Sequence, residues 1–233
     1  ADHDPSFGYS PRGERIEAID ARGASNTEYD ARGRVLRSVD ADGGIIEYQY
    51  DAAGNLIARI SPHQSLLYGY DARNRLIEVT RSIDGEAPST TRYDYDGNGR
   101  RIAMSGGDGT ATAYAYDAQG RLRSLIKRSA AGVLLAAMSY QVDASGLRTG
   151  IEESDASGIV RTVDYVYDGL RRLIEERIDH RDDAHDRIST WTYDRVGNRL
   201  TQTVSAGAEP AVGTTYSYDR NDRLETEHRN GQP

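Results

Sequence analysis

One short motif recurs along most of this chain and constrains its fold more than any other feature. A tyrosine is followed by aspartate, two variable residues, glycine, then arginine or asparagine and an aliphatic residue, as in residues 50–56 (YDAAGNL). Clear copies begin at Tyr29, Tyr50, Tyr95, Tyr116 and Tyr193. Repetition at a short, regular period predicts an array in which each unit is one piece of supersecondary structure.

Weaker copies complete the series. Those that begin at Tyr70, Tyr167 and Tyr218 replace the glycine, and a slipped copy at residues 140–146 (YQVDASG) has valine where the second tyrosine belongs. The aspartates of the nine copies are 20 to 26 residues apart. We interpret this loose period as strands of constant length joined by loops that vary. Of the sixteen tyrosines, we place only Tyr9 outside the pattern.

Each unit is predicted to contain two strands. Two aromatic residues two positions apart precede most of the aspartates, which places both rings on one face of a strand. After the turn, aliphatic and polar residues alternate, as in Leu56, Ala58 and Ile60. We expect the rings of successive units to lie in a file across neighbouring strands and to contact one another. The proposed structural positions are Tyr29, Asp30, Gly33, Tyr48, Tyr50, Asp51, Gly54, Tyr68, Tyr70, Asp71, Tyr93, Tyr95, Asp96, Gly99, Tyr114, Tyr116, Asp117, Gly120, Tyr140, Asp143, Gly146, Tyr165, Tyr167, Asp168, Trp191, Tyr193, Asp194, Gly197, Tyr216, Tyr218 and Asp219.

The step from aspartate to glycine predicts a tight turn. Aspartate at the first turn position accepts a hydrogen bond from the main chain, and glycine at the fourth adopts the left-handed conformation of a type I turn with a G1 bulge. A second turn signal falls about halfway along most units, as at Asp40–Gly43 and Asp155–Gly158. Turns at this spacing predict an all-β fold of antiparallel hairpin repeats in one continuous, curved or spiralling sheet. Residues 130–138 (AAGVLLAAM) have helical propensity, but their place between two turns favours a strand.

Composition excludes several classes of function. The net charge of −8 disfavours a nucleic-acid partner, which would need basic residues against its phosphates. The chain lacks cysteine, so it has no disulfides or thiolate chemistry, and this alone does not assign a compartment. Its apolar runs are far shorter than the ~18 residues of a membrane span. We therefore predict no nucleic-acid partner and no membrane span.

Two stretches resemble metal sites and are weighed against plainer interpretations. Residues 94–99 (DYDGNG) match the first half of a calcium loop, but Ser105 stands where that loop needs a bidentate glutamate. His180 and His185, in an acidic stretch, are five residues apart, a spacing that suits neither a helix face nor a strand face. The ordinary repeat turn and a solvated loop explain these stretches better. We predict no metal site and no cofactor.

Enzymatic activity is not predicted either. The motif aspartates already have a role in turns, and no second acidic residue recurs opposite them to form a glycosidase pair. The sequence has no nucleophile elbow, phosphate loop or zinc-protease motif. No catalytic residue is assigned.

The motif copies together resemble the RHS/YD-repeat family, which includes bacterial Rhs proteins, components of Tc toxins, wall-associated repeat proteins and animal teneurins. The resemblance extends from about Gly13 to Asn230. It implies a β-sheet that spirals into a hollow shell, which in the bacterial toxins encloses a C-terminal toxic polypeptide. It also implies a secreted or cell-surface bacterial protein.

Two features of that family are not found in this sequence: the C-terminal segment that plugs the shell and cleaves itself, and a variable toxin domain. We therefore expect a fragment of a longer shell, with an N-terminal lead-in at residues 1–12 and a repeat array at residues 13–233. The expected function is a structural wall that encapsulates a toxin or effector polypeptide. The expected partners are that polypeptide and other repeats or chains at open sheet edges. The alternative is an extracellular adhesion or glycan-binding surface, for which the tyrosine rings would be exposed in a groove.

Overall fold

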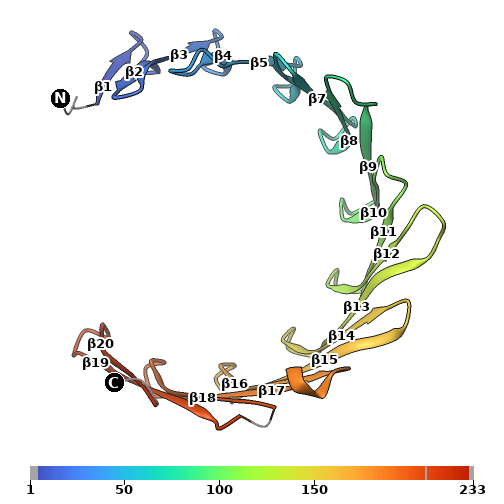
Figure 1. The fold of residues 1–233 in the computed structure, drawn as a ribbon, viewed down its shortest axis with the longest axis vertical. Coiled ribbons are helices and arrows are strands. Elements are labelled where there is room, and N and C mark those ends of the chain that lie inside the picture. Colours follow the sequence, from blue (N-terminus) through green and yellow to red (C-terminus); the bar gives the residue numbers. More distant parts are fainter. Residues whose placement is uncertain (1–4, 208, 231–233) are drawn as a thin grey trace. The chain divides into compact units, whose positions relative to one another are not determined.

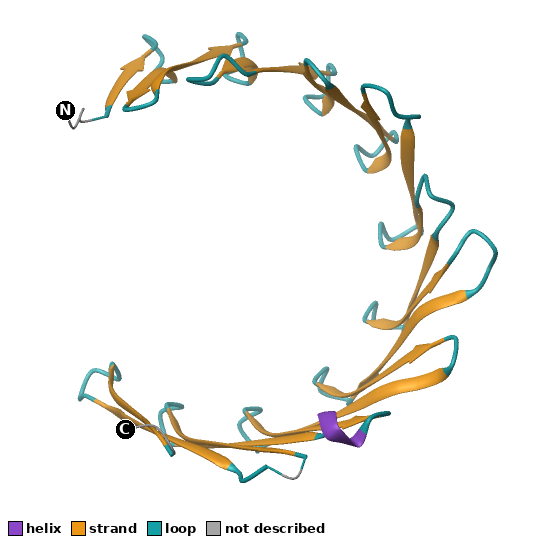
Figure 2. Cartoon of the chain, viewed as in Figure 1, coloured by secondary structure: helices purple, strands orange, loops and turns teal. Residues whose placement is uncertain are grey.

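The computed structural model describes residues 5–207 and 209–230. These residues form an all-β structure in which consecutive strands pair antiparallel, with a single turn of 3-10 helix, η1 (Asp183–His185) (Figure 2). The chain consists of two compact units, Ala1–Ala111 and Thr112–Pro233. Within this described part of the chain, no helix is long and apolar enough to cross a membrane.

The first unit is a meander in which each strand pairs with the strands before and after it in the sequence (Figure 1). Its strands are β1 (Ser6–Tyr9), β2 (Arg15–Asp20), β3 (Gly23–Tyr29), β4 (Val35–Val39), β5 (Ile45–Tyr50), β6 (Leu56–Ser61), β7 (Gln64–Tyr70), β8 (Leu76–Ile83), β9 (Ser89–Tyr95) and β10 (Arg101–Ser105). Strand β11 (Ala111–Tyr116) begins at the last residue of this unit.

The second unit has the same organisation, and its strands β12 to β20 also pair in sequence order. They are β12 (Leu122–Arg128), β13 (Leu134–Val142), β14 (Arg148–Asp155), β15 (Gly158–Tyr167), β16 (Leu173–His180), β17 (Arg187–Tyr193), β18 (Arg199–Ala206), β19 (Val212–Tyr218) and β20 (Leu224–Arg229). Because connections in a meander alternate between the two ends of the strands, all motif turns of a unit lie at one end and the other turns lie at the opposite end.

The motif turns have the predicted geometry. In the turn between β3 and β4, the Asp30 amide donates to the Arg34 carbonyl at 2.8 Å, and the Gly33 amide donates to the Asp30 carbonyl at 3.0 Å. Gly33 has a φ of 75°. The strand register shifts between Glu28 and Tyr29, as a G1 bulge requires. The prediction of a type I turn with a bulge is confirmed.

Each unit buries little of its own surface. The buried apolar residues in the described ranges are Ala58, Tyr140 and Val163, and no large side chain there is fully buried. Substantial contacts join strands that are consecutive in the sequence, so each unit is a single layer of sheet. Stability must therefore come from strand pairing and from contacts along the sheet rather than from a packed core.

The structure settles two points on which the sequence was ambiguous. Residues 134–142 form β13 and the residues before them form a turn, so the prediction of strand over helix for residues 130–138 is confirmed for residues 134–138 and wrong for residues 130–133. Tyr9, in contrast, was wrongly placed outside the pattern. The Gly13 amide donates to the Ser10 carbonyl at 2.9 Å and the Ser10 amide donates to the Glu14 carbonyl at 2.8 Å. Ser10 therefore takes the aspartate's place in a further motif turn between β1 and β2.

Candidate functional site at the repeat turns

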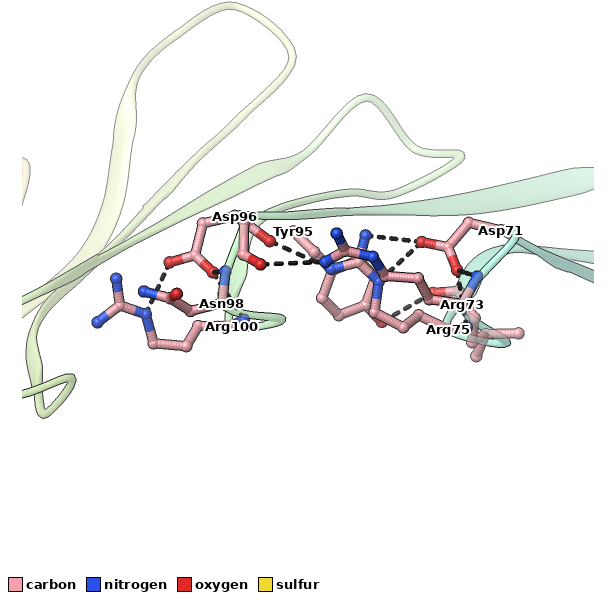
Figure 3. Close-up of polar contacts among 9 residues, drawn as sticks. Asp71, Arg73, Arg75, Tyr95, Asp96, Asn98 and Arg100 are labelled. Carbon is pink, nitrogen blue, oxygen red and sulfur yellow. Dashed lines mark hydrogen bonds and ion pairs between the residues drawn. The ribbon is translucent and has the colours of Figure 1, made fainter.

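The candidate site is the row of motif turns, and each turn is organised by its aspartate. The Asp71 carboxylate accepts hydrogen bonds from the amides of Arg73 and Arg75, at 2.8 and 3.0 Å, and from Arg75 Nε at 2.7 Å (Figure 3). We call the residue after the positive-φ position, here Arg75, the fifth turn residue. Its side chain bonds the motif aspartate in the pairs Asp30–Arg34, Asp51–Asn55, Asp71–Arg75, Asp96–Arg100, Asp117–Arg121, Asp168–Arg172, Asp194–Asn198 and Asp219–Arg223.

These hydrogen bonds lower the pKa of the motif carboxyls. Main-chain and then side-chain hydrogen bonds from Arg75 hold the pKa of Asp71 below its ordinary value of 3.8. The pKa of Asp51 is lowered first by the side-chain amide of Asn55. Both carboxylates are favoured in their charged form because that form accepts more hydrogen bonds. The motif aspartates are thus acceptors in turns, and none has the raised pKa of a general acid.

Six of the second tyrosines reach back to the preceding repeat. Tyr95, at the end of β9, donates its hydroxyl hydrogen to the Leu76 carbonyl at the start of β8, at 2.7 Å. The acceptor lies two residues after the positive-φ residue of the preceding motif turn, Asn74 in this case. The same bond occurs in the pairs Tyr29–Arg15, Tyr50–Val35, Tyr70–Leu56, Tyr95–Leu76, Tyr167–Arg148 and Tyr193–Leu173.

The fifth turn residue reaches in the opposite direction, to the following repeat. The guanidinium of Arg75 lies 4.8 Å from the centroid of the Tyr95 ring, and its Nη1 donates to the Asp96 carbonyl at 3.2 Å (Figure 3). Arg172 repeats both contacts in the second unit, with the Tyr193 ring at 4.8 Å and the Asp194 carbonyl at 2.7 Å. One arginine therefore joins its own aspartate, the next tyrosine and the next turn.

A third contact joins the turns of the first unit at their tips. Arg73, at the third turn position, donates to the Gly97 carbonyl of the next turn at 3.0 Å. Arg12 and Arg32 make the equivalent bonds to the carbonyls of Ala31 and Ala52, at 2.9 and 3.1 Å. These side chains are exposed, so we assign them a smaller share of the stability than the partly buried Arg75.

The slipped copy keeps the turn and changes the packing. The Asp143 carboxylate still accepts from the Leu147 amide at 2.9 Å, and Gly146 has a φ of 92°. Tyr140 is buried, its hydroxyl lies 3.2 Å from the Met138 sulfur, and Arg148 covers its ring at 4.4 Å. The local turn therefore survives the loss of the second tyrosine.

The aromatic rings of the motif are half-buried. Burial raises the pKa of Tyr70 and Tyr167, and the residues between the two rings of a pair, such as Asp94, are exposed. The rings that precede the second tyrosines are also half-buried at Tyr48, Tyr68, Tyr93, Tyr114, Tyr165, Trp191 and Tyr216. The expected contacts between tyrosine rings of successive units are therefore not what joins these repeats: the rings of Tyr50, Tyr95 and Tyr193 are each covered by an arginine of the preceding turn.

The two stretches weighed as metal sites have other roles here. Asp96 accepts a hydrogen bond from Arg100 Nε at 2.6 Å, while Asp94 belongs to β9. The rings of His180 and His185 lie 5.2 Å apart, a proximity that sequence spacing did not predict and that η1 produces. His185 faces Asp182 at 3.1 Å in an exposed loop. Within residues 5–207 and 209–230, no three histidine, cysteine, aspartate or glutamate residues are grouped as a metal would need.

The fold and the repeated turns define a class: an antiparallel β repeat protein whose hairpins are joined through their turns. Comparison with known proteins supports this classification. The family described as RHS Repeat matches residues 29–65, 70–111 and 95–133. The chain therefore carries repeats of the RHS, or YD-repeat, family and is a structural segment built from such repeats.

Two relatives in the curated set are bacterial toxins. Double-stranded DNA deaminase toxin A of Burkholderia cenocepacia is 29% identical over 179 residues, 74% of this chain and 12% of that protein. Toxin protein Tse5 of Pseudomonas aeruginosa is 30% identical over 171 residues, 64% of this chain and 12% of that protein. The chain thus matches a small part of either toxin. A solved structure of the Photorhabdus luminescens Tc holotoxin pore is similar over 97% of this chain and 16% of its own, with 17% identity and a TM-score of 0.41.

Proposed function

We propose that this chain is part of the wall of a hollow β-shell, and that the shell encloses a C-terminal toxin or effector polypeptide of the same protein. The observation that carries the proposal is the use of the motif side chains. Tyrosine hydroxyls bond to the repeat before, and arginines bond to the repeat after. A sheet joined in this way can extend without a core, which is the property that a thin wall requires.

The relatives support the enclosed cargo. Both curated relatives are named as toxins, and the chain matches 12% of each. The proposal includes a secreted or cell-surface location in bacteria, which the same comparison supports. The wall would do no chemistry itself: it would exclude proteases and solvent from the enclosed polypeptide.

The alternative, an adhesive or glycan-binding surface, needs exposed aromatic rings. The motif rings are half-buried, and the second tyrosines use their hydroxyls within the sheet. Aromatic platforms that bind sugars or other flat ligands present an open face, so these rings favour the wall.

Proteolysis of the full-length parent protein tests the proposal. We expect the C-terminal polypeptide to survive protease treatment that digests the same polypeptide when it is expressed alone. The double variant Arg75→Ala with Tyr95→Phe breaks one joint between repeats and should shorten that survival. Arg81→Ala is the matched control, because Arg81 is exposed and pairs only loosely with Glu86, at 3.8 Å. Full digestion of the C-terminal region in the intact parent would refute encapsulation, and saturable glycan binding by the repeats would support the alternative.

A further inference from the structure

Consecutive motif turns meet through two variable positions. In six pairs of consecutive motif turns, the fifth residue of one turn lies against the fourth, positive-φ residue of the next turn, about one repeat further along the chain. Both positions vary in this sequence, and they do not vary independently. The contacts within each unit explain why.

Where the fifth residue is a long side chain, the next turn has glycine at its fourth position. Arg75 Nη1 lies 4.0 Å from the place that a Cβ on Gly99 would occupy, and Arg121 Nη1 lies 3.8 Å from that place on Gly146. A Cβ alone would only touch the guanidinium, but any atom beyond it would compete with the arginine for the same space. The glycine therefore leaves room for the arginine as well as permitting the backbone conformation.

Where the fifth residue is short, the next turn has a larger residue at its fourth position. Asn55 Nδ2 donates to Asn74 Oδ1 at 2.9 Å, and Asn198 Nδ2 donates to Asp222 Oδ1 at 2.9 Å. Asn74 and Asp222 have φ angles of 59° and 60°, so both accept a backbone conformation that L-residues rarely adopt. Their side chains take the place that the guanidinium has in other repeats.

We infer that these two positions form a matched pair that determines which repeat can follow which. A long fifth residue requires glycine, and a short one is followed by a larger residue that fills the space. The residue types of all consecutive motif turns within the two units follow this rule: Glu14–Gly33, Arg34–Gly54, Asn55–Asn74, Arg75–Gly99, Arg121–Gly146, Leu147–Arg171, Arg172–Gly197 and Asn198–Asp222. Nothing lies within 4 Å of a Cβ at Gly197, so the Arg172–Gly197 pair follows the rule in its residue types and not through a contact. The pairing would oppose slippage of the array by one repeat, because a slip places unmatched residues together.

Exchanging the pair types tests this inference in the chain itself. Gly99→Asn places a side chain against Arg75, and Gly43→Asn is the matched control. Both glycines have a φ of 84°, and nothing lies within 4 Å of a Cβ at Gly43. We expect Gly99→Asn to lower the melting temperature by roughly 2–4 °C more than Gly43→Asn, measured by circular dichroism at one protein concentration.

The double variant Arg75→Asn with Gly99→Asn recreates the asparagine pair. We expect its loss of melting temperature to be smaller than the sum of the two single losses, because residues in contact are not additive. The reciprocal exchange, Asn55→Arg with Asn74→Gly, provides a second cycle if Gly99→Asn alone fails to fold. Equal losses for Gly99→Asn and Gly43→Asn, or additive losses in both cycles, would overturn the inference.

Discussion

At the residue scale, the tyrosine hydroxyl is the group that turns a set of hairpins into an array. Six second tyrosines end a strand and donate their hydroxyl hydrogen to a carbonyl of the preceding repeat, 14 to 20 residues earlier. Phenylalanine would keep the ring and lose this bond. The preference of the chain for tyrosine, 16 residues against a single phenylalanine, follows from that difference.

Tyr95→Phe should therefore destabilise the chain by about 0.5–1.5 kcal/mol, the net value of one hydrogen bond. The ring would still lie beside Arg75. Urea unfolding followed by circular dichroism measures the change. Tyr93→Phe is the control: its ring is contacted by Arg101 at 5.8 Å, and its hydroxyl is outside the described hydrogen-bond network, so its effect should stay within about 0.5 kcal/mol. Equal losses for the two variants would show that the hydroxyl of Tyr95 is not a joint between repeats.

At the scale of the element, the motif turn is a local unit with a charged acceptor at its centre. Asp71, Asp96 and Asp168 all have a pKa below 3.8, caused first by the main-chain amide of their fifth turn residue. Because the folded-state pKa is lower than the unfolded one, these carboxylates stabilise the fold above the unfolded value. That stabilisation is lost as the pH falls through the lowered folded-state pKa values.

We therefore expect the free energy of unfolding to be nearly constant from about pH 7 to pH 5 and to decrease below about pH 4. Urea titrations at a series of pH values measure this. Asp71→Asn should reduce the stability at neutral pH and make the acid decrease shallower, since one titrating carboxyl is removed. A midpoint that does not change between neutral pH and about pH 3 would contradict the role assigned to these carboxylates.

At the scale of the whole molecule, the small number of buried apolar side chains among the described residues has consequences for the first and last described strands. Phe7 and Tyr9 of β1 are 50% and 59% exposed, and every residue of β20 is exposed. Tyr9 ends β1 as a second tyrosine ends other strands, but no hydrogen bond of its hydroxyl group is described. Exposed strands of this kind pair with other strands, and repeat arrays without polar caps associate.

The chain on its own should self-associate, with an average mass by light scattering that rises with concentration. Phe7→Lys should reduce the association, because a lysine on an edge strand opposes the approach of a second sheet. Leu170→Lys is the control, since Leu170 is 69% exposed but lies in a turn. A monodisperse monomer at high concentration would show that these strands are not open for pairing.

The strands, the turns and their order could be read from the sequence because they depend on local chemistry. Asp30 and Gly33 meet within one turn, so their spacing alone predicts the hydrogen bonds that the structure has. The same holds for residues 130–138, whose position between two turns predicted a strand and of which residues 134–138 lie in β13. The motif turn at Ser10 was not predicted because serine stands where the other copies have aspartate. The spacing from Ser10 to Gly13 equals that from aspartate to glycine in the motif and could have indicated this turn.

Only the tertiary structure decided how repeats are joined. The partner of Tyr95 is a main-chain carbonyl at Leu76, and the partner of Asn55 is a side chain in the next turn. Such contacts depend on the register between neighbouring strands, and a repeat period that varies from 20 to 26 residues does not specify that register. The sequence by itself determined the hairpin and its turn, since both are set by residues a few positions apart. The hydrogen bonds between repeats, the paired turn positions and the proximity of the His180 and His185 rings depend on how the chain is folded in space, so only the structure reveals them.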